Sequence, residues 1–590
     1  MKRSLFIIII LISFVFTACS SSHHHDNSGQ QETLPEEDPL DNPLVRQTEY
    51  GYVQGIETGA DTWAWLGIPY AEPPVGELRW RAPQDPQAWD DIFIADEFRS
   101  GATQYGGYLT YMDPATYGRL VGSENCLFLN IWRPDTAEDG LPVFFWIHGG
   151  GNSIGEAGLG VYNGANLAHN SNVIVVTINY RLGALGWFNH PSLKTGDDLN
   201  DSGNFGTLDI IKALKWVSDN INRFGGNPNN VTIAGQSAGG YNVLSLMLSP
   251  PAEDLFHKAI VQSGPQMSTS TVEEGQSKAQ DIFIKLLVDD GYSVVEAEEF
   301  IDTQPREELA AYLRSKTPEE IYQHYTQAVS GGLSELFPPF QDGTVIHQDG
   351  WKSFISGDYN KVPLIVGANK DEVKLFMPFI LSGDKDHGFY DLAMDFDPDN
   401  PMDLSQVCDY LNMSLLWIPL YDPISALASG IFEFLCVDMT ASILSLHQEN
   451  IYAYEFVWDD EPEPFDFLNG ACHAVEIPFV FGNFDSTEDS KWRYAWSEAN
   501  RIERKRLSDA IMGYWAQFMY TGNPNRDDLP AWYTWSGSPG GHKRITFDSG
   551  ISMSSKTFDH DELIRRWNES DLSQDLRENI KSLFPETIFD

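Results

Sequence analysis

The chain has 590 residues, of which 42% are hydrophobic and 13% are aromatic, so it can bury a large core and is not a disordered chain. Its 38 Lys and Arg against 85 Asp and Glu give a net charge of −47. A charge of this sign and size excludes nucleic acid and anionic lipid surfaces as partners, because both would be repelled. Five cysteines in a chain of this length do not form a disulfide scaffold.

Residues 1–18 are predicted to be a signal peptide. Two basic residues precede an apolar run from Leu5 to Ala18, which is short for a membrane span but has the length of the hydrophobic region of a signal peptide. The run is followed by Cys19, and the junction resembles a bacterial lipoprotein processing site, at which the cysteine is lipidated and becomes the mature N-terminus. Ordinary secretion, with Cys19 present by chance, is the alternative.

Residues 19–43 are rich in Ser, Pro and acidic residues, which is typical of a flexible tether. Its triplet His23-His24-His25 could bind a transition metal weakly, but three adjacent side chains cannot all face one ion, so a solvated tether is favoured. We therefore expect an exported lipoprotein of the bacterial cell envelope, on the periplasmic or surface face, which meets the membrane only through the lipid on Cys19. Residues 44–590 are expected to fold as one domain.

The body of the chain alternates predicted strands and helices. Short β-branched runs predict strands at 142–150, 173–181, 231–237, 259–264, 362–370 and 451–458. Most of these runs are continuously apolar, as expected of strands that are buried on both faces of a largely parallel sheet. Apolar residues at steps of three and four predict a helix over 207–221, which Gly225-Gly226 ends. This alternation predicts an α/β domain with functional loops at the C-terminal ends of the strands.

Ser237 is the predicted nucleophile. The predicted strand 231–237 runs into Gly235-Gln236-Ser237-Ala238-Gly239, which is a G-x-S-x-G sequence. A sharp turn from strand to helix would push the serine hydroxyl outward, and the flanking glycines would leave room for the strained backbone. The motif alone is often a simple turn. The strand before it and the small residues after it favour the catalytic interpretation.

A glycine-rich loop is predicted to supply an oxyanion hole. His148-Gly149-Gly150-Gly151 comes at the end of a predicted buried strand. Glycines there would let the backbone approach a substrate, so the N–H groups of Gly150, Gly151 and Ala238 are the predicted donors. A merely flexible loop is the alternative. His148 is interpreted as a structural residue of this loop rather than as the general base.

An acid and then a histidine should follow the nucleophile in the chain. The adjacent Asp371 and Glu372 follow the predicted strand 362–370, and His473 comes later. His473 would take the proton of Ser237 and pass it to the leaving alcohol, while the acid would hold the tautomer of the imidazole. Chain order singles out His473 among 14 histidines. It does not choose between the two acids.

Five ordered segments carry a resemblance to a known family: GIPYAEPPVGELRWRAP (67–83), SENCLFLNIWRP (123–134), FGGNPNNVTIAGQSAGG (224–240), ANKDEVKLF (368–376) and GACHAVEIPFVFGN (470–483). From about residue 50 to 525 the chain resembles a type-B carboxylesterase of the carboxylesterase/cholinesterase family. The resemblance implies an α/β-hydrolase fold, with a central, mostly parallel sheet flanked by helices and large loop and helix insertions. It also implies Glu372 as the triad acid, with Asp371 as its neighbour, and Ser263 and Glu124 as supporting polar residues near the site.

Departures from the family pattern carry further expectations. Cys126 stands where the family has a disulfide, but residues 98–107 offer no cysteine to pair with it, so Cys126 is expected to be a buried free thiol. A bridge between Cys436 and Cys472 stays open, because pairing cannot be read from sequence. Thr116 occupies the position of the choline-binding tryptophan of cholinesterases, so acetylcholine specificity is not expected.

The resemblance implies a serine hydrolase that cleaves small-molecule carboxylic esters through an acyl-enzyme, with a Ser-His-Glu triad and no metal or organic cofactor. A thioesterase, amidase or lipase on the same scaffold is the first alternative. A non-catalytic adhesion domain is the second, but such relatives lack a triad residue, whereas Ser237, Glu372 and His473 are all present. The C-terminal sequence is expected to hold no tetramerisation helix or membrane anchor, and no oligomeric state is predicted.

Overall fold

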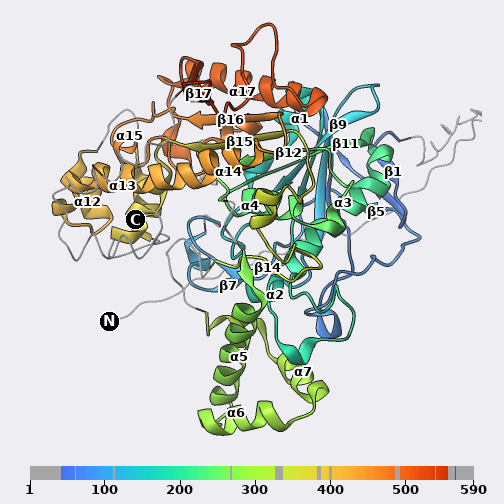
Figure 1. The fold of residues 1–590 in the computed structure, drawn as a ribbon. Coiled ribbons are helices and arrows are strands. Elements are labelled where there is room, and N and C mark those ends of the chain that lie inside the picture. The colour runs from blue at the N-terminus through green and yellow to red at the C-terminus, as the bar shows by residue number, and fades with distance from the viewer. Residues whose placement is uncertain are drawn as a thin grey trace, which may run out of the picture. The chain divides into compact units, whose positions relative to one another are not determined.

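The structure is a computed structural model. It describes residues 42–555 apart from 60, 111–112, 266–268, 326–335, 382–386, 398–401, 485–491 and 539, together with residue 565. The chain divides after Asn42, and the unit from Pro43 to Asp590 carries the described fold (Figure 1). The predicted signal peptide, the lipidation site Cys19 and the tether up to residue 41 lie outside the described residues, so they stay predictions.

An 11-stranded sheet forms the centre of this unit (Figure 1). In spatial order its strands are β18 (Ser552–Ser554), β17 (Arg544–Phe547), β16 (Ile451–Phe456), β15 (Leu364–Asn369), β12 (Lys258–Gln262), β11 (Gly226–Gln236), β9 (Leu141–Ile147), β10 (Ile174–Ile178), β8 (Phe128–Pro134), β4 (Thr62–Pro69) and β3 (Ile56–Thr58). Neighbours from β17 to β10 run parallel. Antiparallel pairs occur only towards the two edges of this sheet as it is described. The predicted, largely parallel sheet is confirmed.

All six predicted strands are present, as β9, β10, β11, β12, β15 and β16. The predicted helix over 207–221 is α3 (Phe205–Asn220), which continues as a 3-10 turn over Ile221–Phe224. Gly225, with a φ of +80°, ends this turn in the left-handed region that favours glycine. The edge strands β3, β4, β8, β17 and β18 are not among those that the apolar runs predict.

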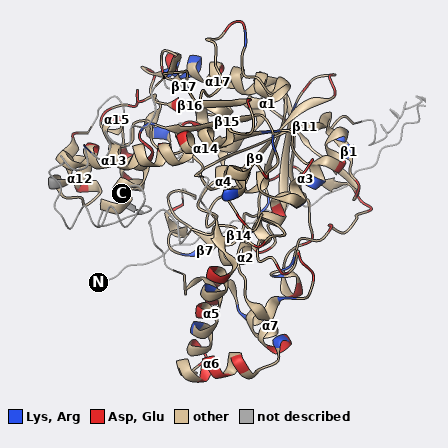
Figure 2. Cartoon of the chain, in the orientation of Figure 1, with Lys and Arg blue, Asp and Glu red and all other residues tan. Residues whose placement is uncertain are grey.

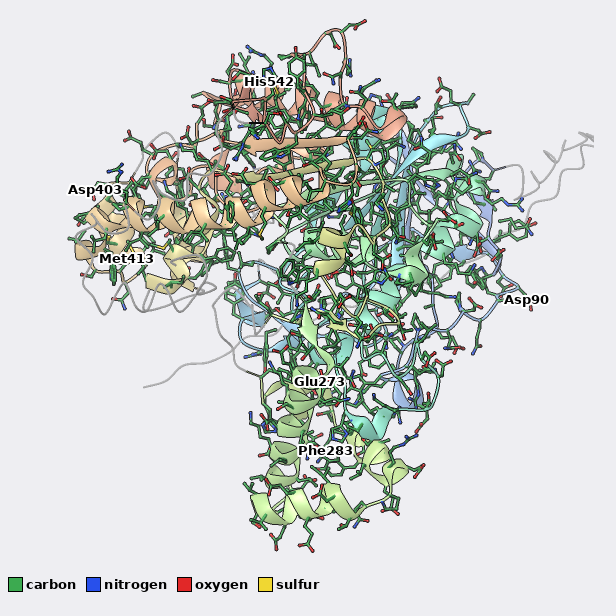
Figure 3. The ribbon with its side chains drawn as sticks, viewed as in Figure 1. Asp90, Glu273, Phe283, Asp403, Met413 and His542 are labelled. Atoms are coloured by element: carbon green, nitrogen blue, oxygen red, sulfur yellow. The ribbon has the colours of Figure 1, made fainter. Side chains whose placement is uncertain are left out.

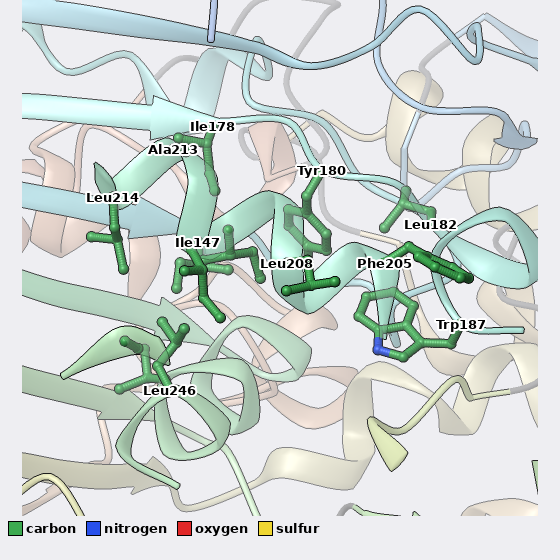
Figure 4. Close-up of a cluster of buried hydrophobic side chains, with 14 of the residues drawn as sticks. Ile147, Ile178, Tyr180, Leu182, Trp187, Phe205, Leu208, Ala213, Leu214 and Leu246 are labelled. Carbon is green, nitrogen blue, oxygen red and sulfur yellow. The ribbon is translucent and has the colours of Figure 1, made fainter. Parts of the chain in front are cut away.

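Side chains of the central strands alternate between two apolar layers. In β9, Phe145 and Ile147 belong to one layer and Phe144 and Trp146 to the other, and all four are fully buried. The first layer is covered by α3 and by α4 (Ala238–Met247). Figure 4 shows part of it, where side chains of the sheet meet those of the helices: Ile147, Ile178, Leu208, Leu214 and Leu246.

The second apolar layer is covered mainly by α1 (Ala165–Ser171), α16 (Ile477–Phe481) and α17 (Arg501–Thr521). Burial on both faces explains why the central strands read as unbroken apolar runs. Short elements complete the described unit: β1 (Val45–Gln47), β2 (Tyr52–Gln54), β5 (Phe93–Ile94), β6 (Gln104–Tyr105), β7 (Leu120–Val121), β13 (Ser270–Thr271), β14 (Phe340–Gln341), α2 (Gly183–Gly186), α9 (Lys352–Ser356) and α15 (Phe465–Leu468).

Two groups of helices are inserted between strands, as the family resemblance implies. The first lies between β12 and β15 and comprises α5 (Val272–Asp289), α6 (Val294–Thr303), α7 (Arg306–Ser315) and α8 (Pro318–Tyr322). The second lies between β15 and β16 and comprises α10 (Met377–Leu381), α11 (His387–Asp395), α12 (Leu404–Tyr410), α13 (Ile418–Glu433) and α14 (Met439–Leu444). Although the insertions separate β12, β15 and β16 in the chain, these strands are still neighbours in the sheet.

Three of the four helices of the first insertion, α5, α6 and α8, begin with capping boxes. The side chains of Thr271, Ser293 and Thr317 each accept a hydrogen bond from the backbone N–H of a glutamate three residues later, whose own side chain accepts from the capping residue's N–H. Acidic side chains in these first turns also favour the positive end of the helix dipole. Figure 2 shows acidic residues along α5 and α6, and Figure 3 labels Glu273 in the first turn of α5 and the buried Phe283 further along it.

The second insertion contains a long apolar helix. α13 passes through a π-helical turn, Phe434–Asp438, into α14, so that Ile418–Leu444 is one helix of 27 residues. Its length and composition alone would allow it to cross a membrane, but half of its most apolar window is buried inside the protein. Glu433 and Asp438 bind the buried guanidinium of Arg544 in β17. These ion pairs tie the helix to the sheet, so we interpret it as a core helix.

The four cysteines among the described residues, Cys126, Cys408, Cys436 and Cys472, are buried free thiols. For Cys126 this agrees with the prediction. The bridge between Cys436 and Cys472, which the sequence leaves open, is not formed.

Candidate functional site

Ser237 lies at the turn between β11 and α4, with a φ of +57° and a ψ of −122°. A positive φ is strained for a residue other than glycine. The backbone N–H of Ser237 donates to the carbonyl of Gln262 at the end of β12, at 2.8 Å, and its own carbonyl accepts from the N–H of Tyr241 in α4, at 3.0 Å. These bonds hold the strained residue between a neighbouring strand and the helix, where it is half-buried.

The glycines around Ser237 have no room for a side chain. A Cβ on Gly235 would lie 2.4 Å from the carbonyl carbon of Gly239. A Cβ on Gly239 would lie 1.9 Å from the carbonyl oxygen of Ile147, the last residue of β9. The turn that carries Ser237 is therefore packed directly against the backbone that leads into the loop 148–151.

His473 and Glu372 form a buried pair. Nδ1 of His473 donates to Oε2 of Glu372, and both side chains are shielded from solvent. Oε1 of Glu372 accepts from the hydroxyl of Ser263 at 2.5 Å and from the N–H of Asn369 at 2.7 Å. A carboxylate with three donors around it is fixed in position. The pair therefore holds the imidazole in the tautomer whose Nε2 carries a lone pair.

The other ring nitrogen of His473 faces the serine turn. Its Nε2 lies 3.1 Å from Nε2 of Gln236, the residue before Ser237. With Nδ1 donating to Glu372, this contact is a hydrogen bond from the amide of Gln236 to the imidazole lone pair. The rings of Phe376 and Phe432 pack against the imidazole, with centroids at 5.4 and 5.7 Å. The basic edge of His473 thus lies beside the turn, and Gln236 occupies it in this structure.

A second buried carboxylate, Glu476, lies behind the pair. Its two oxygens accept from the amides of Gln262, at 3.0 Å, and Asn369, at 2.6 Å. Burial, together with the nearby negative charge of Glu372, raises the pKa of Glu476 to about 7, although the two amides and His473 act in the opposite direction. The region behind the imidazole is therefore polar and buried, and each oxygen of the Glu476 carboxylate accepts a hydrogen bond there.

The loop after β9 brings free N–H groups to the same place. Gly150 and Gly151 have φ values of +100° and +64°. Among the described residues, no acceptor takes the N–H of Gly150, Gly151 or Ala238. Ala238 is the first residue of α4, where backbone N–H groups have no partner within the helix and the helix dipole favours negative charge. These three donors are available to an anion.

Most of the predicted site residues lie at this one edge of the sheet. Ser237, Ala238, Gly150 and Gly151 meet through the contacts of Gly239 with Ile147, and His473 with Glu372 reaches Ser237's neighbour, Gln236. The described hydrogen bonds of His473 Nε2 do not include one to Ser237. Catalytic hydrogen bonds are often long without substrate and tighten in the Michaelis complex.

Three further predicted residues take different places. Asp371 lies 3.6 Å from Lys374 and 3.8 Å from Lys370, with no described contact to His473. Glu124 binds Arg79 with both oxygens, so the structure does not place its carboxylate on the triad pair. His148 stacks on Tyr180, and burial lowers its pKa to about 4, which suits the predicted structural role.

Sequence reasoning missed Gln236, Glu476, Asn369 and Gln262. Gln236 lies inside the G-x-S-x-G motif, at a position that the motif leaves variable, so no residue type signalled its contact with His473. Glu476 lies three residues after His473, within a segment that the family resemblance covers. Its partners come from the ends of β12 and β15, which are distant in sequence. Only the register of the parallel sheet brings them together.

A metal centre is not apparent in the described part of the chain, where no group of three His, Cys, Asp or Glu side chains is arranged to hold an ion. Whether His23-His24-His25 binds a metal is outside the described residues.

Comparison with known proteins agrees on one family. The family model described as "Carboxylesterase family" matches residues 42–408 and 421–561. The para-nitrobenzyl esterase of Bacillus subtilis (strain 168) is 34% identical over 504 residues, covering 82% of this chain and 92% of that protein. The human cocaine esterase is 32% identical over 518 residues, covering 82% of this chain and 83% of that protein.

Solved structures show the same fold. A para-nitrobenzyl esterase structure superposes with a TM-score of 0.63 at 31% identity, covering 89% of this chain and 99% of that chain. The carboxylesterase of Geobacillus stearothermophilus at pH 6.2 superposes with a TM-score of 0.62 at 27% identity, covering 89% of this chain and all of that chain. The α/β-hydrolase fold predicted from the sequence is confirmed.

Proposed function

Because the chain belongs to the carboxylesterase family and hydrolyses carboxylic esters, we propose that Ser237, His473 and Glu372 are the triad that carries the reaction. Ser237 is the nucleophile, His473 the general base and acid, and Glu372 the group that orients His473. The observation that carries this proposal is the orientation of the His473 ring. Its Nδ1 is held by Glu372, while its Nε2 points at the residue next to Ser237.

In the proposed reaction, Oγ of Ser237 attacks the ester carbonyl carbon as its proton moves to Nε2 of His473. The tetrahedral intermediate collapses, the bond to the alkoxy oxygen breaks, and that oxygen takes the proton from His473 to leave as an alcohol. Water then repeats the sequence on the acyl-enzyme and releases the carboxylic acid and free Ser237. For Nε2 to receive the serine proton, the amide of Gln236 must give up its hydrogen bond to the imidazole.

The negative charge of the intermediate is assigned to the N–H groups of Gly150, Gly151 and Ala238. The lack of any described acceptor for these donors, and the position of Ala238 at the start of α4, support this assignment. Glu372 orients His473 and stabilises the imidazolium that forms on it.

The triad is tested with Ser237→Ala on a short-chain p-nitrophenyl ester. We expect turnover to fall to the background rate while the thermal unfolding midpoint changes little, because the half-buried hydroxyl makes no described side-chain hydrogen bond. Ser263→Ala is a matched control: it removes a hydroxyl from the same sheet edge, but one that only supports Glu372. Turnover retained by Ser237→Ala would refute the proposed nucleophile.

The substrate class is open to a direct measurement. The relatives are named for para-nitrobenzyl esters, cocaine and acylcarnitine, all of which contain a carboxylic ester. We propose that this chain likewise takes small-molecule esters. A panel of p-nitrophenyl esters of graded acyl length, beside thioester and amide analogues, distinguishes an esterase from a thioesterase or amidase. A rate that rises sharply above the solubility limit of a long-chain ester would identify a lipase instead.

We further propose that the protein is exported and anchored through a lipid on Cys19. Support comes from the apolar run that ends at Ala18, the cysteine that follows it and the polar tether up to residue 43. Cys19→Ser should move the protein from the membrane fraction to the soluble fraction without changing its specific activity. Unchanged membrane association would refute the anchor.

A further inference from the structure

The proposed oxyanion hole is built from two separate elements. Gly150 and Gly151 belong to the loop after β9, whereas Ala238 begins α4. Donors must lie about 2.7–3.1 Å from the developing oxyanion, so the loop and the helix have to be held at a fixed distance from one another. The contact of Gly239 with Ile147 limits how closely they approach. Some other interaction must keep them from separating.

Asn152 supplies such an interaction. It follows Gly151 directly, is fully buried and has a φ of +57°. Its Oδ1 accepts from Nδ2 of Asn242 in α4 at 2.8 Å, and its Nδ2 lies 3.4 Å from Oδ1 of the same residue. The two amides therefore form a reciprocal pair between the loop and the helix, in a site from which water is excluded.

The same amide also holds a third segment. Nδ2 of Asn152 donates to the carbonyl of Phe337 at 2.9 Å, and the N–H of Phe337 donates to the carbonyl of Gly151 at 3.2 Å. The carbonyl of Asn152 accepts from the N–H of Gly183 at 2.7 Å. Phe337, three residues before β14, is thus held on the loop by both of its backbone groups.

Tyr180 also contacts the loop that carries Gly150, Gly151 and Asn152. Its hydroxyl donates to the carbonyl of His148 at 2.7 Å and lies 3.4 Å from Oδ1 of Asn152. Its ring is fully buried and stacks on His148 at 4.5 Å. Figure 4 shows Tyr180 among the buried side chains of the first apolar layer. The loop is therefore held by Tyr180 through the carbonyl of His148, and the amide of Asn152 connects it to α4.

We infer that Asn152 is a positioning residue for ester hydrolysis: its side-chain amide sets the Gly150–Gly151 donors at the correct distance from Ala238 and Ser237. The inference rests on the proposed oxyanion hole. Asn152 itself does not touch the substrate. Without this amide, Asn242 and the carbonyl of Phe337 each lose a buried hydrogen-bond partner. The strained backbone at Asn152 is then free to relax. As a result, the N–H groups of Gly150 and Gly151 move relative to that of Ala238.

Asn152→Ala is the direct test, on purified full-length protein with a p-nitrophenyl ester. Losing one oxyanion donor lowers kcat by about 100- to 1,000-fold in serine hydrolases, and misplacing two donors without deleting them should cost less. We expect kcat to fall by about 10- to 100-fold with KM within about twofold. The affinity for a trifluoromethyl ketone, which adds to the serine and places a negative oxygen in the donor set, should fall by the same factor as kcat.

Asn130→Ala is the matched control. Asn130 is an equally buried asparagine in β8, and its amide binds Gly67 and Thr177 rather than the loop. We expect Asn130→Ala to lower the unfolding midpoint while leaving kcat and ketone affinity within about twofold of wild type. If both variants lose activity equally, or if Asn152→Ala keeps wild-type kcat and ketone affinity, the inference is wrong.

Asn242→Ala approaches the same hydrogen bond from the helix, and it keeps the test decisive if Asn152→Ala does not fold. It should lower kcat and ketone affinity together, and the double variant should be no worse than Asn152→Ala beyond about twofold, since both changes break one link. Additive losses would contradict a shared link. Ser237→Ala is assayed in parallel. Turnover retained by that variant would refute the proposed function, whatever the asparagine variants show.

Discussion

Two adjacent acids, Asp371 and Glu372, face different partners at the end of β15. Glu372 accepts from His473, Ser263 and the backbone of Asn369, whereas Asp371 lies between two lysines. A 3-10 turn over Glu372–Leu375 begins at this point and turns the two side chains to different sides. The family resemblance chose Glu372, and the contacts give a physical reason for that choice.

Glu372→Gln should lower kcat by about 10⁴-fold, because an amide at this position can stabilise the wrong tautomer of His473 and provides no charge for the imidazolium. Asp371→Asn is the matched control and should leave kcat within about threefold. The measurement is steady-state hydrolysis of p-nitrophenyl butyrate by both variants. A larger loss in Asp371→Asn than in Glu372→Gln would mean that the acids have been assigned in the wrong order.

Glu461 is a buried carboxyl without a described hydrogen-bond partner for either oxygen. Burial raises its pKa well above the usual range, and neighbouring Asp459 and Asp371 act in the same direction. In the unfolded chain the group ionises near pH 4.5, so as pH rises the unfolded state loses this proton while the folded state retains it. The raised pKa therefore lowers the free energy of unfolding progressively above about pH 4.5, until the folded pKa is passed.

Glu461→Gln should raise the unfolding midpoint at pH 8 and leave it nearly unchanged at pH 4.5, since a neutral amide has no proton to lose. Thermal unfolding of wild type and variant at both pH values measures this. Glu463→Gln, at an exposed position two residues away, is the control and should change neither value. A midpoint that falls at pH 8 in Glu461→Gln would show that the carboxyl is ionised and paired in the folded protein.

At the scale of elements, Arg544 joins β17 to the helix Ile418–Leu444. Its guanidinium is buried between Glu433 and Asp438, at the π-helical turn. The same helix accepts the N–H of Val373 on Ser429 Oγ at 3.0 Å and packs Phe432 against His473. A contact that fixes this helix therefore also supports the residues that surround the imidazole.

Arg544→Ala should lower the free energy of unfolding by about 3–5 kcal/mol, because it removes the buried positive charge that balances the largely buried carboxylates of Glu433 and Asp438. Denaturant unfolding measures the change. Arg506→Ala is the control, since Arg506 forms an exposed pair with Glu503 and should change stability by less than about 0.5 kcal/mol. A small effect of Arg544→Ala would mean that the two carboxylates find other partners or become protonated.

The central elements could be predicted because they are buried on both faces. β9, β10, β11, β12, β15 and β16 read as apolar runs, and their parallel order places the residues that follow them at one edge. The edge strands could not be found in this way. β8, for example, contains Asn130 and Arg133, which form hydrogen bonds with distant residues such as Gly67 and Phe224. Such partners are invisible in a local pattern.

Sequence motifs and their order in the chain were enough to predict Ser237, His473 and the glycines as site residues. The side chains that surround these residues were not predictable, because their contacts join positions more than 80 residues apart: Gln236 with His473, Asn152 with Asn242, and Glu476 with Gln262. Amide residues make such contacts from many positions. Only the folded backbone shows which ones are used.

At the scale of the whole molecule, the net charge of −47 is the dominant property. Figure 2 shows acidic residues, in red, at many places along the ribbon, and basic residues are fewer than half as numerous in the sequence. Like charges at this density repel one another and destabilise the compact state. Salt shortens the range of this repulsion, from about 30 Å at 0.01 M to about 8 Å at 0.15 M.

The unfolding midpoint should therefore rise between 0.01 and 0.15 M NaCl at pH 7.5. Potassium chloride at the same ionic strength should have the same effect, because screening depends on charge rather than on ion identity. An equal osmolality of sucrose at low salt is the control for a general solute effect. A midpoint that is constant or falls with added salt would show that local ion pairs outweigh the general repulsion.

The docking of Phe337 on Gly151 limits how the molecule can be recombined. The helices α5 to α8 follow one another in the chain between β12 and β15, which makes them an obvious module to exchange for the matching segment of a relative when a new selectivity is wanted. Phe337 follows that module in the chain, whereas Gly151 and Asn152, to which it is hydrogen-bonded, precede it. A chimaera that returns to the sequence of this protein before residue 336 keeps Phe337, Gly151 and Asn152 from one protein, so their hydrogen bonds are retained. In a chimaera that returns later, these hydrogen bonds must form between residues of two different proteins.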